Sequence, residues 1–325
     1  MKRRDFLRTS LAAPALLAVQ GLPASLRAQS AKFPSQPIRT IWPGGGGGAP
    51  YAIVRMIANA AMERDGTNIV IEDRPGTTVG SVAVKNADPD GYTIMVGRNS
   101  THAANVTLIK DLPYDPVTDF APITNLFVMN QALVVPSSLG VNSVDELRDL
   151  ARKTPGGLSY ASPGLGSGAQ LMAAMLAKAF DAPMTHVPYR SSPAVLPDLL
   201  SGRVHLFFNT LRLFRDEIQA GRIKVLAVAS DTRFKPNPDV PTLAEEGYPG
   251  IAIESWSGLF APAKTSPERI QILNKMFATA AQSIADDVED RGFTIRTSTP
   301  EEFRTLVKTD IERLGKIIKA VGATP

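Results

Sequence analysis

The sequence predicts an α/β protein whose sheets are mostly parallel and flanked by helices. Two observations lead to this fold class. Segments with the composition of strands alternate with helical patterns almost throughout the chain. A strand, a glycine-rich loop and a helix also follow one another twice, in residues 38–63 and again in residues 158–180. The 325 residues contain no cysteine, so a hydrophobic core rather than disulfides has to stabilise the fold.

Residues 1–28 are predicted to be an export signal rather than part of the fold. A basic head is followed by an apolar run, Leu11–Val19, and by a small-residue cleavage segment at 24–28. The apolar run is too short to cross a bilayer. Arg3-Arg4 followed by Phe6-Leu7 predicts the twin-arginine route to the periplasm, with a chance pair of arginines as the alternative.

Removing this segment changes the charge of the chain. The whole sequence has 35 basic and 31 acidic residues, and residues 1–28 hold five of the basic residues and one of the acidic ones. The remainder therefore carries 30 of each. Because the high isoelectric point belongs to the leader, we expect neither nucleic-acid binding nor membrane insertion after its removal. The three histidines match no metal motif, and we expect no metal and no cofactor.

The first strand–loop–helix unit predicts an anion site. A strand at Ile38–Trp42 leads into a run of five glycines, and a helix begins near Pro50. Free N–H groups at a helix N-terminus, approached by backbone without side chains, form such a site. A flexible spacer is the alternative. The candidate ligand-binding residues here are Gly45, Gly46, Gly47, Gly48 and Tyr51.

The next strands deliver polar side chains to the same edge of the predicted sheet. A strand at 68–72 ends in a turn, a short helix follows at 81–87, and a strand at 92–96 leads into a polar segment. Ligands of open α/β sheets lie beyond the carboxyl ends of the strands. This rule makes candidates of Arg98, Asn99 and Thr101, and it leaves His102 as a ligand contact to consider.

A second unit begins near Gln131–Val135 and repeats the opening pattern. Ser143 and Glu146 predict a capping box for a helix that ends at Lys153. A strand at 158–161, a small-residue loop and a helix at 169–180 follow. Two such loops predict an anionic ligand held between two lobes. The candidates in the second loop are Ser162, Gly164, Gly166, Ser167 and Gly168.

The rest of the chain completes the second unit and returns to the first. Strands are predicted at 185–187, 204–208 and 224–229, helices at 194–200 and before Gly221, and Asn209 is a further candidate for ligand contact. Ser266 and Thr299 are predicted to cap two amphipathic helices, the last of which is expected to pack on the first lobe. The predicted first domain is therefore discontinuous, 33–129 plus 231–322, with residues 130–230 as an inserted second domain.

Motifs of enzymes are weak in this sequence. Around Ser167 the nucleophile-elbow pattern fails at Leu165 and Ala169, and no P-loop lysine follows the glycines. One enzymatic alternative stays open. The segment Gly44-x-Gly46-x-x-Ala49 after a strand, with Glu72 and Asp73 ending the next one, fits an exported dinucleotide-binding oxidoreductase.

Several segments in order resemble one protein family, the solute-binding proteins of tripartite tricarboxylate transporters of the Bordetella uptake gene (Bug) type. They span the chain after the leader and include PSQPIRTIWPGGGG, LPYDPVTDFAPIT, LSYASPGLGSGAQL and HVPYRSSPAVLPDLLSG. The resemblance implies a periplasmic binding protein of the type II fold, with two lobes that clamp a small carboxylate and no enzymatic activity. It also implies loops at 44–51 and 162–168 as the carboxylate contacts, and delivery to a membrane permease, while the sequence does not say whether the protein serves a sensor kinase instead. A monomer is expected.

The chain departs from the family pattern where the ligand is expected. Tyr51 stands where members usually carry an aspartate, Arg98 replaces a small residue, and the stretch after Gly76 is shorter. A lost acid and a gained guanidinium make the pocket more positive, and a ring can stack on a flat ligand. The expected ligand is therefore a carboxylate, aromatic ones included, rather than an amino acid. Hinges for lobe closure are expected at 128–131 and 229–231.

Overall fold

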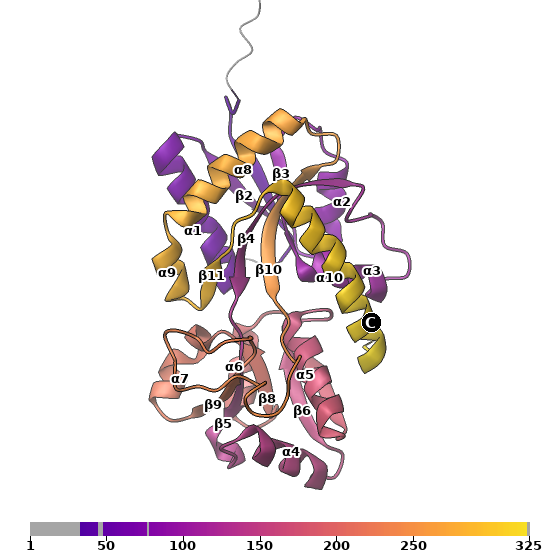
Figure 1. The fold of residues 1–325 in the computed structure, drawn as a ribbon, viewed down its shortest axis with the longest axis vertical. Helices are drawn as coiled ribbons and strands as arrows, with labels where there is room; N and C mark the ends of the chain where they lie inside the picture. The colour runs from indigo at the N-terminus through magenta and orange to yellow at the C-terminus, as the bar shows by residue number, and fades with distance from the viewer. Residues whose placement is uncertain (1–32, 45–47, 77, 324–325) are drawn as a thin grey trace, which may run out of the picture. The chain divides into compact units, whose positions relative to one another are not determined.

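Two β-sheets with helices on their faces make up the fold (Figure 1). The computed structural model describes residues 33–323 except 45–47 and 77, and the chain from Phe33 onward forms one compact unit. The predicted α/β class with two helix-flanked sheets is confirmed. The predicted export signal at 1–28 lies outside the described residues.

The first sheet contains six strands, which are β1 (Ile38–Trp42), β2 (Ile69–Asp73), β3 (Thr93–Arg98), β4 (Phe120–Met129), β10 (Ser255–Pro262) and β11 (Phe293–Ile295). Their order is β11-β4-β10-β3-β1-β2. β1 runs parallel to both β2 and β3, whereas β10 runs antiparallel to both β3 and β4. β4, β10 and β11 have no counterpart among the predicted strands.

The second sheet contains five strands, which are β5 (Ala132–Pro136), β6 (Leu158–Ser162), β7 (Met184–Pro188), β8 (Leu206–Asn209) and β9 (Ile223–Val228). Their order is β7-β6-β8-β5-β9. β6 is parallel to β7 and β8, and β5 is antiparallel to β8 and β9. The prediction of mostly parallel sheets holds for strand direction, because the strands that run against the others are β5 in the second sheet and β10 and β11 in the first. β5 and β10 each arrive from the other sheet at the edge where the parallel strands end, so each has to run the opposite way.

This reversal explains where the loops lie. Ala132 at the start of β5 is paired with Asn209 at the end of β8, and Ser257 near the start of β10 is paired with Arg98 at the end of β3. The carboxyl ends of the parallel strands in both sheets therefore lie at the edges where the chain crosses between the sheets. The predicted loops after β1, β3, β6 and β8 leave from these two edges.

Helices flank both sheets. They are α1 (Ala49–Asp65), α2 (Val79–Lys85), α3 (Asn105–Leu108), α4 (Val144–Lys153), α5 (Gly168–Phe180), α6 (Leu196–Leu200), α7 (Arg215–Gln219), α8 (Pro267–Gln282), α9 (Ala285–Glu289) and α10 (Pro300–Val321). The polar segment after β3 forms a single π-helical turn, Ser100–Ala104, before α3. None of the helices in the described residues is both long and apolar enough to span a bilayer.

The predicted helix caps depend on local sequence, and most are present. Ser266 caps α8, and Thr299 forms a complete capping box with Glu302 at the start of α10. Ser143 caps α4 as predicted, but the box is incomplete. The carboxylate of Glu146 accepts from the backbone N–H of Asn142 at 2.7 Å instead of that of Ser143.

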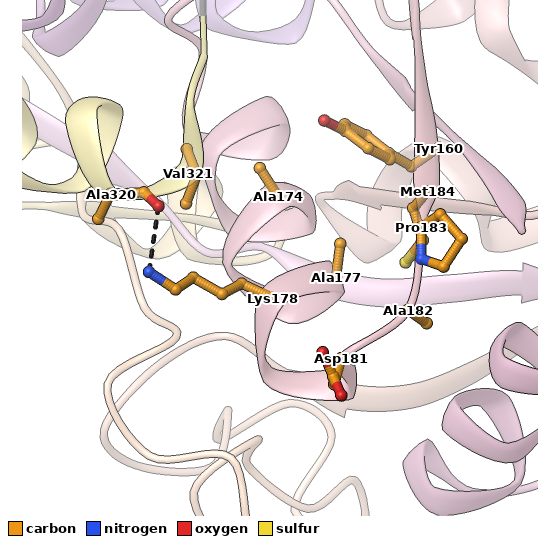
Figure 2. Close-up of a pocket in the computed structure, with 10 residues that line it drawn as sticks. All are labelled: Tyr160, Ala174, Ala177, Lys178, Asp181, Ala182, Pro183, Met184, Ala320 and Val321. Carbon is orange, nitrogen blue, oxygen red and sulfur yellow. Dashed lines mark hydrogen bonds between the residues drawn. The ribbon is translucent and has the colours of Figure 1, made fainter.

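The last helix, α10, was predicted to pack on the first lobe alone. It contacts elements of both sheets. Phe303 and Val307 in its first half pack against β10 and β4. In its second half Leu314 and Ile318 belong to the buried cluster that fills the second sheet's core, and α10 contacts α5 there. Figure 2 shows Lys178 of α5 reaching the end of α10, where its Nζ donates to the Ala320 carbonyl at 3.1 Å. This contact borders a pocket of about 400 Å³.

The segment between β9 and β10 remains close to the second sheet. Leu243, Tyr248, Ile251 and Ile253 join the same buried cluster as β5, β6 and β8. The predicted division at residue 231 stays a prediction, since the sheets themselves contain only residues 38–129 with 255–295, and 132–228.

Burial of His102 predicts that the protein loses stability in acid. Its ring is fully buried and stacked on Phe260, with centroids 4.0 Å apart, and this burial lowers the pKa of His102 from 6.5 to about 3. As the pH falls, the His102 ring takes up a proton in the unfolded chain before it does so in the folded protein. The free energy of unfolding is therefore at its full value above pH 6.5 and decreases from there toward pH 3. The expected loss is about 1.4 kcal/mol per pH unit within that window.

Urea unfolding between pH 7 and pH 4.5 measures this effect, with His102→Gln as the comparison. The variant is expected to start from lower stability but to show a shallower pH dependence, because it lacks the titrating ring. Parallel pH profiles for the two proteins would contradict the assignment.

Candidate functional site

Arg98 ends β3 and is a half-buried cation without a counter-ion among the described residues. Its guanidinium carbon lies 5.3 Å from the centre of the Trp42 ring, and its Nε is buried without a hydrogen-bond partner. None of the carboxylates in the described part of the chain forms an ion pair with it. Removal from water disfavours the charged form and lowers the pKa of Arg98. An arginine stays protonated at neutral pH, so the charge is present and not neutralised.

Trp42 is the residue that the sequence analysis missed. It is 2% exposed and lies between the candidate ligand groups of the first sheet. Its ring meets the edge of Tyr51 at a centroid distance of 5.7 Å, and a Cβ on Gly44 would lie 2.8 Å from its Nε1. The aromatic residue directly before the glycine run was the signal available, because only glycine allows backbone to lie this close to an indole.

The N-terminus of α1 follows the first glycine loop. Gly48 is its N-cap in an extended conformation, and no side chain caps the helix. Pro50 has no N–H, so the free donors of the first turn are the N–H groups of Ala49 and Tyr51. Gly45, Gly46 and Gly47, which were predicted to bind the ligand, lie outside the described residues.

The π-helical turn after Arg98 contains one open donor and two structural residues. Asn99 is 5% exposed, and its Nδ2 is buried without a partner. The Thr101 hydroxyl accepts from the Arg98 N–H at 2.9 Å, which favours a structural role for Thr101. His102, considered as a ligand contact, is instead a core residue, because its ring is fully buried among Phe120, Tyr114 and Phe260.

The second loop uses most of its own donors. The Ser162 Oγ accepts from the Gly164 N–H at 3.1 Å and contacts the His186 Nε2 at 2.6 Å, and the Gly166 N–H donates to the Gln170 Oε1 at 2.7 Å. These three predicted contacts thus shape the loop. Among the described residues, no acceptor pairs with the backbone N–H groups at the first two residues of α5, Gly168 and Ala169.

Two candidates in this region have defined partners. Ser167 is the N-cap of α5, with its Oγ accepting from the Gln170 N–H at 3.3 Å and donating to the Gly164 carbonyl at 2.7 Å. Asn209 donates from Nδ2 to the Ser192 Oγ at 2.8 Å, while its Oδ1 accepts from the Thr210 N–H at 2.8 Å. The second N–H of its amide group lets Asn209 keep both bonds and still donate to a ligand.

The second loop lies directly against the first sheet's edge. A Cβ on Gly166 would lie 2.7 Å from Leu108 Cδ1, and one on Gly168 would lie 2.3 Å from the Ser255 Oγ. Ser255 stands two residues before Ser257, the β10 partner of Arg98. Two residues of strand span about 7 Å. The open N-terminus of α5 therefore lies near the backbone at the end of β3, while the Arg98 guanidinium lies over Trp42 on β1.

This arrangement is suited to holding an anion. It combines one cation, the Asn99 amide and the N-terminal N–H groups of two helices, where the helix dipole also favours negative charge. The dinucleotide alternative finds no support here. Glu72, its proposed ribose contact, is held by Arg74 at 2.6 Å and faces Arg39 at 3.6 Å, while Asp73 is exposed.

The chain is similar to known proteins over most of its length. Residues 53–323 match a family described as "Tripartite tricarboxylate transporter family receptor". A protein of Pseudomonas sp. strain P51, encoded between tcbD and tcbE, is 35% identical over 91% of this chain and 89% of its own length. Protein BugT of Bordetella pertussis is 28% identical over 94% of this chain and 95% of its own length.

Solved structures show the same similarity. The Rpa4515 protein of R. palustris, solved with adipate, is 32% identical, with a TM-score of 0.83 over 90% of this chain and 99% of that one. MatC of Rhodopseudomonas palustris, solved with bound malate, is 26% identical, with a TM-score of 0.77 over 88% of this chain and 100% of that one.

Proposed function

Because this chain belongs to the tripartite tricarboxylate transporter family of receptors, Bug type, we propose that it captures a small organic carboxylate in the periplasm and delivers it to a tripartite permease. The observation that carries the proposal is the un-neutralised Arg98 at the end of β3, with the open N-terminus of α5 across the crossover against Ser255 of the neighbouring strand β10. A carboxylate supplies the missing counter-ion of Arg98. It can accept hydrogen bonds from the guanidinium and from the N–H groups at the start of α5.

The chemistry of the site supports a carboxylate over an amino acid. An ammonium group needs an acceptor with negative charge, and the described residues place no carboxylate beside Arg98. The adipate and malate in two relatives fit the same charge requirement. Tyr51 is half-buried beside Trp42 and offers a ring to a flat ligand, so aromatic acids belong to the proposed class. The proposed contacts are Gly48, Tyr51, Arg98, Asn99, Ser167 and Gly168.

Lobe closure is the proposed mechanism of capture. A ligand shifts the protein to a closed state only by binding that state more tightly, and a ligand held from both sheets does so. The proposed hinges are the two crossovers at 128–131 and 229–231, with domains of 33–129 plus 231–322 and of 130–230. Export by the twin-arginine route and a monomeric state complete the proposal.

A thermal-shift panel tests this function. The panel contains succinate, malate, adipate and terephthalate, the amides of these acids, glutamate, and NAD and NADP. At a hundredfold excess over Kd, a ligand adds about 2.7 kcal/mol of stability, which raises Tm by roughly 5 °C in a domain of this size. We expect at least one acid to give such a shift and its amide to give none. A shift with NAD alone, or with none of the acids, would overturn the proposal.

A further inference from the structure

Arg98 and Trp42 form one of two arginine–aromatic contacts among the described residues, the other being Arg269 over Phe33 at 5.1 Å. Other guanidinium groups lie against acids, as Arg74 does with Glu72 at 2.6 Å and Arg313 with Asp310 at 3.0 Å, whereas Arg269 donates to the Asp90 carbonyl. At Arg98 the partner is an indole face instead, 5.3 Å from the guanidinium carbon.

The difference matters because the two kinds of partner act differently on charge. A carboxylate positions a guanidinium and also neutralises it, so little attraction remains for a ligand. An aromatic face attracts the cation through its quadrupole and supports its planar group but carries no net charge. Arg98 is thus held in place while its full charge stays available.

Trp42 is itself firmly held. It is 2% exposed and packs with Ile53, Val54 and Ile57 in the core beneath α1. Tyr51 meets one edge of its ring and the start of the glycine loop at Gly44 lies along another. A single buried indole therefore supports three elements of the first-sheet half of the site.

We propose that Trp42 is a positioning residue that holds Arg98 as an un-neutralised cation, so that this end of the site accepts only a fully ionised oxyanion. The proposal rests on the carboxylate-binding function proposed above and names the selectivity of that site. A neutral ester or amide at this end leaves the buried charge without a counter-ion, which is costly in a desolvated position. The site then selects acids over their neutral derivatives more strongly than α5's N–H groups alone would.

The test compares an acid with its neutral derivative in matched variants. The probes are adipate, or the panel acid with the larger thermal shift, and its monomethyl and dimethyl esters, measured by calorimetry. Wild type is expected to bind the diacid at least about tenfold more tightly than the monoester. In Trp42→Leu this ratio is expected to fall by about tenfold, because a mobile guanidinium no longer meets the oxyanion in one geometry.

Two controls separate positioning from general loosening of the fold. Trp42→Phe keeps an aromatic face and is expected to keep most of the ratio. Trp256→Phe removes the chain's other tryptophan, whose ring packs against Phe303 of α10 and donates to Asp310 at 2.7 Å, although the next residue, Ser257, pairs with Arg98. It is expected to lower stability and leave the ratio unchanged.

The outcomes distinguish this inference from the function on which it depends. If wild type binds none of the acids, the proposed function fails, and this inference with it. If wild type binds an acid but Trp42→Leu weakens acid and ester equally, only the positioning role of Trp42 is overturned. A ratio that falls in Trp256→Phe as much as in Trp42→Leu also overturns it.

Discussion

Replacing Ser167 with aspartate is expected to weaken binding of the panel acid by at least about a hundredfold. Ser167 caps α5 directly beside the open N–H groups of Gly168 and Ala169. A carboxylate at this position occupies those donors from within the chain and repels the carboxylate of the ligand. Isothermal calorimetry on the folded variant measures the loss.

Aspartate is a sensible choice because it caps helices as well as serine does, so α5 is expected to remain intact. Ser167→Asn is the matched control, since asparagine has the same shape and caps a helix but carries no charge. We expect its affinity to stay within about fivefold of wild type. Equal losses in both variants would show that the Ser167–Gly164 bond matters and that the second loop does not meet the ligand's charge.

Local features of the fold were predictable because the residues that produce them are close together in sequence. Ser266 and Thr299 cap the helices that begin immediately after them, and each predicted strand of the second sheet ends within two residues of its observed end. The two glycine-rich loops followed by helices were likewise readable, because they need only adjacent residues.

Features that depend on distant residues were not predictable in this way. The direction of β10 is determined by its arrival from the second sheet, and nothing within Ser255–Pro262 encodes it. The amphipathic pattern of α10 predicts burial of Leu314 and Ile318 but does not say that α5, more than 130 residues earlier, covers them. The same reason accounts for the prediction that α10 packs on the first lobe alone.

The residues of the candidate site show the same difference between local and distant features. Sequence reasoning found Arg98, Asn99 and Ser167 because they follow strands or precede helices. It could not tell which of the loop's N–H groups stay open, since that depends on Gln170 reaching back to Gly166. It also took Trp42 for the end of a core strand, because its contact with Arg98 joins positions 56 residues apart.

Replacing Arg98 with alanine is expected to weaken binding of the same acid by tenfold or more, because the ligand's carboxylate loses the guanidinium that serves as its counter-ion. The unliganded protein, in contrast, is expected to keep or raise its Tm, since a buried charge without a partner is costly and the variant removes it. Arg98→Lys is expected to lie between, because an ammonium keeps the charge but lacks the planar group that stacks on Trp42.

Arg74→Ala provides the matched control for this prediction. Arg74 follows β2 at the same edge of the sheet, but Glu72 already neutralises it at 2.6 Å. Removing it should therefore change the affinity for the acid little, although the net charge of the two variants is the same. If both variants lose affinity equally, general electrostatic attraction explains the binding. If Arg98→Ala alone binds as wild type does, the guanidinium does not face the ligand, and the proposed site loses its cation.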